Sequence, residues 1–328
     1  MASANKGSSS LPRSSCRIPI PPDTPVEPLT GRRALPMPVT KAVIPAAGFG
    51  TRFLPATKSQ PKEMLPVVDT PAIQYVVEEC VESGITDILI VIGRGKRAIE
   101  EHFCSAPELE AQLEEKGQTE LLGEVRRISN MASIQFAWQK QPDGLGDAVS
   151  YGQDFAGGDP FALLLGDTII SSNNPGNPVL RQMIEIFEAR QASVVALEEV
   201  DPHKVSRYGI AGGHEEGGGI LALKQLIEKP SPEEAPSNLA IAARYVFQPE
   251  IFNYLSETPR GKNNEIQLTD AMISLLQNHG MYGLRLSGKR HDIGNKLDFI
   301  KANVALGLQR TDISSELAAY LHKAVAEL

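Results

Sequence analysis

The feature that most constrains the fold is a set of three consecutive segments, apolar, helical and apolar, in the first third of the chain. KAVIP at 41–45 and ILIVIG at 88–93 are near-continuous apolar runs, which are typical of strands buried on both faces of a sheet. Between them, residues 72–83 place apolar side chains at helical spacing and stop at Gly84, a residue common just past a helix end. Because parallel strands need a long, usually helical crossover, these segments predict a βαβ unit.

The rest of the chain continues this alternation of strands and helices. Further strand candidates are the apolar segments at 134–138, 161–165, 193–197 and 245–248. Helical patterns precede or separate several of them, and such alternation indicates helices packed on a sheet. We therefore predict an α/β fold that is Rossmann-like and three-layered, with a mixed, mostly parallel sheet flanked by helices.

The chain divides into an N-terminal extension and one large domain. Residues 1–38 are Ser-rich and then Pro-rich without apolar periodicity, so we predict that they are disordered. They weakly resemble an organelle transit peptide, but we favour an untargeted flexible tail. Residues 39–328 form the predicted domain, with a charged helical excursion at about 105–128 and a helical C-terminal region at about 295–328.

Composition excludes several classes of protein. A net charge of −8 argues against binding to nucleic acid or an anionic membrane, because either partner requires a broad positive surface. No apolar run reaches the roughly 20 residues of a membrane-spanning helix. The three cysteines show no CxxC spacing, so they suggest neither a disulfide framework nor a zinc ribbon. We expect a cytoplasmic protein that binds neither nucleic acid nor membranes.

A glycine-rich loop with isolated cations follows the first predicted strand. The stretch AAGFGTRFLPATKSQPKEMLP at 46–66 includes Arg52 and Lys62 among glycines and prolines. Glycines let backbone N–H groups approach a ligand at the carboxyl ends of strands, where open α/β sheets bind ligands. The loop lacks the third glycine of GxGxxG and the GxxxxGK[ST] of a P-loop. Two discrete cations suit a triphosphate, although a Pro/Gly connector with surface cations has the same pattern.

The loop resembles the N-terminal signature of nucleotide-sugar pyrophosphorylases, a family of nucleotidyltransferases. Further matches follow in the family's order: QPDGLGDA, LLLGDT, RYGI, EKP, APSNLAIAARYVF, NNEIQLTDA and GKRHDIGNK. One departure is LGD at 165–167, where many relatives carry LPD. The resemblance covers residues 41 to about 306 and implies that 39–328 are a nucleotidyltransferase domain of the nucleotide-diphospho-sugar transferase type. It also implies a homo-oligomer, either a dimer or a tetramer.

The resemblance implies nucleotidyl transfer, in which a sugar 1-phosphate attacks the α-phosphorus of a nucleoside triphosphate and pyrophosphate leaves. The expected substrates are UTP and glucose 1-phosphate, the product is UDP-glucose, and the cofactor is Mg²⁺. A phosphate monoester with a second pKa of about 6 is largely ionised at neutral pH and needs no general base. The site must orient and neutralise two anions, which predicts cations and carboxylates in place of a Ser/His/Asp triad.

Matched motif by motif, the resemblance implies four groups of site residues. Arg52 is expected to contact the leaving phosphates and Lys62 the α-phosphate. The nucleotide is expected to contact Ala47, Gly48, Gly50, Thr51, Glu63, Gln141, Gly144 and Gly146. The residues expected at the sugar phosphate are Gly209, Glu228 and Lys229. Those expected to bind Mg²⁺ are Asp167 and Asp292.

Ordinary structural roles and other functions stay open at this point. Asp167 could simply form a turn, Asp292 could make structural hydrogen bonds, and Glu63 could form a surface salt bridge. A thymidylyltransferase or another nucleotide-sugar pyrophosphorylase would share these motifs, because one methyl group changes binding by only about 1–3 kcal/mol. A non-catalytic sugar-nucleotide sensor would be expected to lose Lys62, Asp167 or Lys229, and a GT-A glycosyltransferase typically has a DxD motif, which this sequence lacks.

Overall fold

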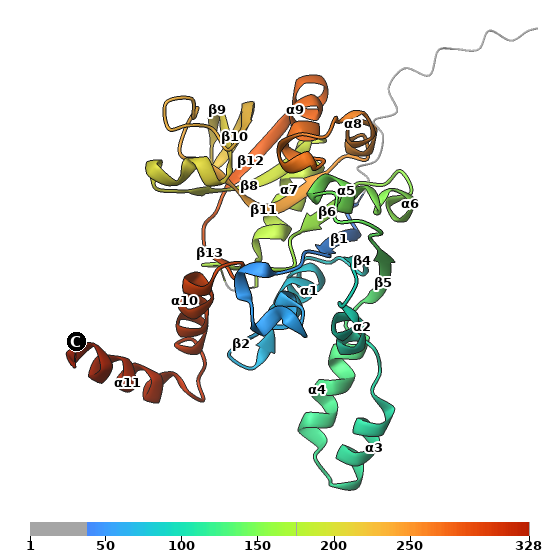
Figure 1. The fold of residues 1–328 in the computed structure, drawn as a ribbon, viewed down its shortest axis with the longest axis vertical. Coiled ribbons are helices and arrows are strands. Elements are labelled where there is room, and N and C mark those ends of the chain that lie inside the picture. The colour runs from blue at the N-terminus through green and yellow to red at the C-terminus, as the bar shows by residue number, and fades with distance from the viewer. Residues whose placement is uncertain (1–37, 175, 328) are drawn as a thin grey trace, which may run out of the picture. The chain divides into compact units, whose positions relative to one another are not determined.

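The structure is a computed structural model that describes residues 38–174 and 176–327 (Figure 1). The extension at 1–38 that the sequence predicts to be disordered lies outside the described residues, apart from its last residue.

One large sheet forms the centre of the described part of the chain. Its strands are β1 (Lys41–Ala46), β4 (Asp87–Ile92), β5 (Ser133–Trp138), β6 (Phe161–Leu164), β8 (Ser193–Glu199), β9 (Gly209–Gly217), β10 (Ile220–Glu228), β11 (Leu239–Phe247) and β12 (Met281–Arg285). They are ordered β5-β4-β1-β6-β11-β8-β12-β10-β9. The first four pair in parallel, as do β8 and β12, whereas β9, β10 and β11 pair with their neighbours in antiparallel fashion. The predicted α/β fold with a mixed sheet is confirmed. The sheet is not mostly parallel as expected: among the described residues, four of its strand pairings are parallel and five, all involving β9, β10 or β11, are antiparallel.

Side chains of β1 alternate between two apolar cores on opposite faces of the sheet. Ile44 belongs to one core and Val43 to the other, and both are fully buried. Their register partners on β4, Ile90 and Leu89, alternate in the same way. Burial on both faces explains why these strands read as continuous apolar runs in the sequence.

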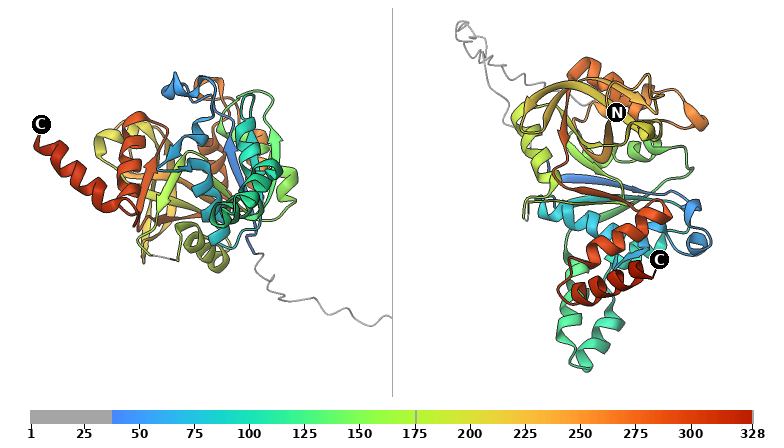
Figure 2. Two further views of the ribbon diagram at one scale, coloured as in Figure 1. Left: turned by 90° about the horizontal axis from the view of Figure 1, so that it is seen from below. Right: turned by 90° about the vertical axis from the view of Figure 1, so that its left-hand side faces the viewer.

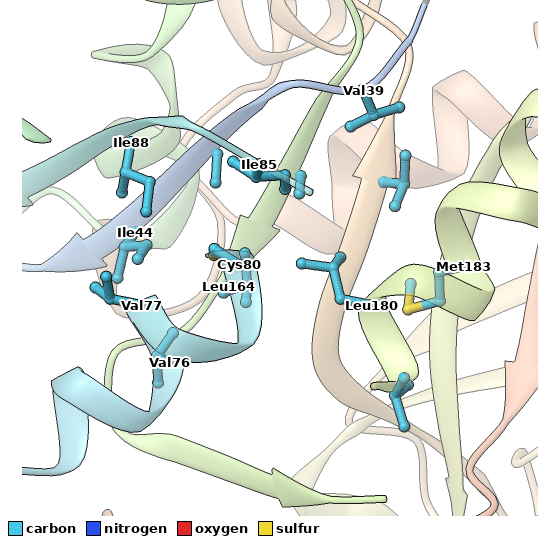
Figure 3. Packing of buried hydrophobic residues seen from close by; sticks show 14 of the residues in the cluster. Val39, Ile44, Val76, Val77, Cys80, Ile85, Ile88, Leu164, Leu180 and Met183 are labelled. Atoms are coloured by element: carbon cyan, nitrogen blue, oxygen red, sulfur yellow. The ribbon is translucent and has the colours of Figure 1, made fainter. Parts of the chain in front are cut away.

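Helices cover both faces of the sheet. The first core includes side chains of α1 (Ala72–Glu82), α2 (Arg97–Phe103) and α7 (Val179–Arg190). The second includes side chains of α5 (Leu145–Ser150), α6 (Gln153–Ala156), α8 (Ile251–Glu257) and α9 (Leu268–His279). Figure 3 shows the first core, where Val77 of α1 lies beside Ile44 of β1, and Leu180 and Met183 of α7 belong to the same cluster. Helix, sheet and helix thus form the three predicted layers.

Two helical segments extend away from the sheet. The charged excursion forms α3 (Pro107–Glu115) and α4 (Thr119–Asn130), which project from the β4–β5 side (Figure 1). Near the C-terminus lie α10 (Lys296–Gly307) and α11 (Ser314–Ala326), and α11 extends outward with no buried residue (Figure 2). Among the described residues, no helix combines the length and the apolar character needed to cross a membrane.

Short strand pairs complete the fold around the sheet. β2 (Pro66–Val67) pairs with β3 (Thr70–Pro71), and β7 (Thr168–Ser171) pairs with β13 (Lys289–Asp292). α10 packs on β13 and begins after Asn295, whose side-chain oxygen accepts a hydrogen bond from Asp298 N at 3.0 Å. The β7–β13 pair brings segments more than a hundred residues apart to one place, next to the end of β6.

Arg244 on β11 is fully buried and joins three parts of the fold. Its Nε and Nη2 donate to Glu79 Oε2 of α1 at 3.0 and 2.8 Å. Nη2 also donates to the carbonyl of Thr168 at 2.8 Å, and Nη1 donates to the carbonyl of Ala243. A buried charge is tolerated only when it is paired and hydrogen-bonded, as this guanidinium is.

We expect Arg244→Met to lower the free energy of unfolding by about 3–5 kcal/mol, because Glu79 would be left as an unpaired buried charge. Urea denaturation followed by circular dichroism measures this change. Adding Glu79→Leu should recover part of the loss, since it removes the orphaned carboxylate. The control is Arg97→Met, which breaks an exposed pair with Glu101 and should cost about 0–1 kcal/mol. Equal effects of Arg244→Met and Arg97→Met would contradict the prediction.

Candidate active site

A hollow of about 540 Å³ lies where four parallel strands end. The chain leaves β1, β4, β5 and β6 at the same edge of the sheet, because these strands run in the same direction. We call this space the first hollow. The predicted site residues that line it are Ala47, Gly48, Gly50, Thr51, Lys62, Glu63, Gly144 and Asp167.

The glycine-rich loop packs directly on the side chain of Lys62. Gly50 has a φ of 65°, and a Cβ added there would lie 3.1 Å from Cβ of Lys62. Thr57 Oγ1 donates to the carbonyl of Gly50 at 2.7 Å, which ties the two ends of the loop together. A side chain at position 50 would therefore be strained and would displace Lys62. The glycine both turns the loop and makes room for the lysine.

Lys62 and Asp167 form an ion pair at the edge of the first hollow. Burial alone would lower the pKa of Lys62, but the charges of Asp167 and Glu63 outweigh it and raise that pKa. Burial would likewise raise the pKa of Asp167, but Lys62, with a smaller contribution from Arg52, holds it below its usual value. Both groups are therefore charged at neutral pH, which leaves one cation and one carboxylate at the edge of the hollow.

Lys96 is a part of the site that the sequence did not predict. Its Nζ lies 2.7 Å from Glu63 Oε2, and the two residues are 4% and 1% exposed. Burial raises the pKa of Glu63, and the charges of Lys96 and Lys62 lower it. The effect of burial is larger, so the pKa lies above its usual value. Glu63 Oε1 is also 4.0 Å from Lys62 Nζ, so this buried carboxyl connects the two lysines. The sequence feature that could have indicated Lys96 is GRGK at 93–96. It follows the second strand directly and so lies at the same sheet edge as the glycine-rich loop.

The structure places Gln139 in the first hollow, where Gln141 was predicted. Gln139 follows directly after β5, lines the hollow and donates from Nε2 to Asp147 Oδ2 at 2.6 Å. Gln141 has an exposed side chain and, among the described residues, is not part of the lining. At Gln141, three residues past the end of β5, the chain has already turned outward, and the motif QPDGLGDA alone could not show this.

Gly144 and Gly146 lie against a loop from a distant part of the chain. Gly144 has a φ of 107°, and a Cβ there would lie 2.8 Å from the carbonyl of Ile266. A Cβ at Gly146 would lie 2.7 Å from Cγ2 of Ile266, and Gly146 N donates to the Ile266 carbonyl at 2.9 Å. These glycines thus permit close packing on the segment that carries Glu265, which also lines the hollow.

A second hollow of about 310 Å³ adjoins the first, because Leu145 and Glu265 line both. It contains the three residues predicted for the sugar phosphate, Gly209, Glu228 and Lys229. Lys229 Nζ lies 2.7 Å from Glu228 Oε1, and Thr269 Oγ1 donates to Glu228 Oε2 at 2.8 Å. Gly209 pairs with Glu228 across β9 and β10, so its backbone lies at the wall of this hollow.

Asp292 lies beside Asp167, although the two are far apart in the sequence. Ile293 N donates to the carbonyl of Asp167 at 3.1 Å. A Cβ on Gly294 would lie 2.9 Å from Asp292 Oδ1, 3.4 Å from Asp167 Oδ2 and 3.8 Å from Nη1 of Arg52. The two carboxylates and the Arg52 guanidinium therefore converge on one point, although Arg52 itself is exposed.

The paired aspartates fit a hard divalent cation. Among residues 38–174 and 176–327, no group of three or more His, Cys, Asp or Glu side chains could hold a metal ion. Mg²⁺ usually takes only one or two carboxylates from the protein and completes its shell with water and substrate phosphates. Two adjacent carboxylates, one of them with a lowered pKa, supply such a set.

Comparison with known proteins places this arrangement in a family. The nucleotidyl transferase family matches residues 41–308. The chain is 50% identical over 287 residues to the UTP–glucose-1-phosphate uridylyltransferase YngB of Bacillus subtilis, covering 88% of this chain and 96% of that protein. A UTP-bound UGPase from Acinetobacter baumannii is 40% identical with a TM-score of 0.81, covering 86% of this chain and 98% of that one. A UDP-glucose pyrophosphorylase in complex with UDP-glucose is 42% identical with a TM-score of 0.75, covering 83% and 100%.

We expect Lys96→Met to make stability fall with rising pH above about 4.3, the ordinary pKa of glutamate. Without Lys96 the pKa of Glu63 in the fold rises further above that value, so the folded state binds more protons than the unfolded state. The free energy of unfolding then decreases as the pH rises toward the pKa of the folded state. Urea denaturation at several pH values from 4 to 8 measures this dependence.

The matched control is the double variant Lys96→Met/Glu63→Gln, which has no titrating carboxyl at position 63. It should lack the additional pH dependence of Lys96→Met. If both variants lose stability equally with pH, Glu63 is not the group responsible.

Proposed function

The chain belongs to the nucleotidyl transferase family, and from this premise we propose that it is a UTP–glucose-1-phosphate uridylyltransferase. The observation that carries the proposal is the pair of adjoining hollows, one beside a glycine loop with Lys62 and the other beside Glu228 and Lys229. A nucleoside triphosphate suits the first and a sugar phosphate the second. The similar proteins named for this activity, and those bound to UTP or UDP-glucose, support this assignment.

The proposed reaction exchanges one phosphorus–oxygen bond for another. A phosphate oxygen of glucose 1-phosphate attacks the α-phosphorus of UTP, the bond from that phosphorus to the β-phosphate oxygen breaks, and pyrophosphate leaves. No proton has to be removed from the nucleophile, because it is already an anion at neutral pH. The protein's task is therefore to align two anions and to neutralise charge as it develops.

Lys62 would neutralise the α-phosphate during the transfer, and Arg52 the leaving phosphates. The raised pKa of Lys62 keeps its ammonium group charged throughout the neutral range. Backbone N–H groups of the glycine loop, from Ala47 to Thr51, would contact the phosphate chain from the other side. The Lys96–Glu63 pair would fix the backbone turn that holds Lys62.

Asp167 and Asp292 would hold Mg²⁺ at the point where they converge beside Gly294. Bound there, the ion would supply positive charge to the phosphate oxygens. In the second hollow, Glu228 would accept hydrogen bonds from sugar hydroxyls while Lys229 would pair with the sugar phosphate. Gln139 and the backbone at Gly144 would contact the uracil, since an amide both donates and accepts hydrogen bonds.

We further propose that the protein acts in the cytoplasm as a homo-oligomer, a dimer or tetramer. Support comes from family likeness and from α11, whose exposed apolar side chains include Tyr320 and Val325. Light scattering on the purified protein measures the assembly directly.

The first test is pyrophosphate release from UTP, dTTP, CTP, ATP and GTP, each with glucose 1-phosphate and Mg²⁺, and each repeated with EDTA. We expect release from UTP that is at least tenfold faster than from dTTP and that disappears with EDTA. A preference for dTTP would instead support a thymidylyltransferase. Absence of release with every pair would contradict the proposed activity.

We expect Lys62→Ala to lower kcat by about 10²–10³-fold, the loss typical of removing one group that stabilises transition-state charge. Steady-state pyrophosphate release measures the change. Lys58→Ala is the matched control, because Lys58 lies in the same loop with an exposed side chain and, among the described residues, does not line the hollow. Near-normal kcat in Lys62→Ala would refute the role given to this lysine.

A further inference from the structure

Arg290 lies between the two halves of the proposed site and has no role in the reaction as described above. It is on β13, and its side chain is only 9% exposed. Nε donates to Glu198 Oε2, near the end of β8, at 2.6 Å. The guanidinium is thus charge-paired and fixed in place, and its remaining contacts point to both substrate regions.

One contact of Arg290 reaches the sugar-phosphate side. Its guanidinium carbon lies 5.1 Å from the ring centroid of Tyr208, within the roughly 6 Å of a cation–π interaction. Tyr208 lines the second hollow, and its carbonyl accepts a hydrogen bond from Lys229 N at 3.0 Å. Lys229 has a φ of 49°, an uncommon backbone conformation that this hydrogen bond helps to hold. Arg290 thereby fixes Tyr208, and Tyr208 fixes the backbone of Lys229.

Another contact of Arg290 reaches the metal side. Asp292 is two residues further along the same strand, so the two side chains are on one face of it. Arg290 Nη1 lies 3.8 Å from Asp292 Oδ2, while Oδ1 accepts a hydrogen bond from Gly294 N at 2.9 Å. The carboxylate is therefore oriented from both sides. Arg290, Asp292 and Tyr208 also line a common charged hollow of about 250 Å³.

We propose that Arg290 is a positioning residue that holds Asp292 and Tyr208 at a fixed separation and so aligns the metal-binding carboxylates with Lys229. The inference rests on the proposed function, because it assigns no substrate of its own. Transfer requires the attacking oxygen within about 3–3.5 Å of the phosphorus, and a displacement of about 1 Å can cost about 10²-fold in rate. Partners that orient metal ligands typically contribute about 10–100-fold to metal affinity or activity.

The test compares Arg290→Met with wild-type protein in two binding measurements and one rate measurement. Calorimetry gives the Kd of glucose 1-phosphate, and electron paramagnetic resonance gives Mn²⁺ binding with and without UTP. We expect both affinities and the rate of pyrophosphate release to fall by about 10-fold or more. UTP binding measured in EDTA should stay within about twofold of wild type, because Arg290 is not part of the first hollow's lining. If Arg290 only stabilised the fold, Arg290→Met would weaken the binding of UTP as much as the binding of glucose 1-phosphate and Mn²⁺.

The matched control is Arg190→Met, which removes an arginine of the same kind from outside the site. Arg190 lies over the ring of Tyr282, 5.2 Å from its centroid, and pairs with Glu216 at 2.8 Å. We expect this variant to bind all three ligands as wild type does. If Arg290→Met does not fold, Arg290→Lys keeps the charge but not the planar contact with Tyr208, and glucose 1-phosphate binding should still weaken severalfold.

The outcomes separate the inference from the proposed function. Active wild-type protein together with a folded Arg290→Met variant of unchanged affinities would overturn the role of Arg290 alone. Wild-type protein that releases no pyrophosphate would contradict the proposed function, and the Mn²⁺ measurement would then still decide whether Arg290 orients Asp292. Equal losses in Arg190→Met and Arg290→Met would also overturn the inference, because they would indicate a general effect on stability.

Discussion

The buried guanidinium of Arg244 connects the core of the fold to the edge where the site lies. It binds Glu79 on α1 and the carbonyl of Thr168, the residue that follows Asp167. A fully desolvated cation tolerates little movement of its partners, since each lost hydrogen bond leaves a buried charge less satisfied. The turn after β6 is therefore held against α1. This contact fixes the backbone next to Asp167, from which its carboxylate extends. Stability and site geometry depend on the same contact.

Charges of alternating sign run inward from this turn. Asp167 pairs with Lys62, Lys62 lies near Glu63, and Glu63 pairs with Lys96. Lys62 thus lies between two anions and Lys96 beside one, so the buried region carries no large net charge. A phosphate chain brings several more negative charges, which Lys62, Arg52 and a divalent ion between Asp167 and Asp292 would balance. The arrangement explains how a protein with a net charge of −8 can present a local site for anions.

The sequence was most informative where one segment contains both the structural and the chemical signal. KAVIP predicted β1 correctly, and the glycine loop that follows it directs attention to Lys62, which lines the first hollow, because strand, turn and cation are contiguous. The sequence was less informative after β5. Positions 139 and 141 are both glutamine, and only the direction of the chain past Trp138 distinguishes them. The antiparallel hairpin of β9 and β10 was not predicted either, since both strands are partly exposed and β9 contains glycines that weaken an apolar pattern.

From the sequence alone follow the βαβ start, the alternation of strands and helices, the family resemblance and a set of candidate residues for the site. These features are local, or they recur in a fixed order along the chain. Tertiary structure alone decided which of the candidates meet: Asp167 with Asp292 through the β7–β13 pair, Lys96 with Glu63, and Arg290 with Tyr208. Such contacts depend on how segments far apart in the chain are brought together. On β13, for example, a one-residue slip in its pairing with β7 would turn Arg290 and Asp292 to the other face of the strand.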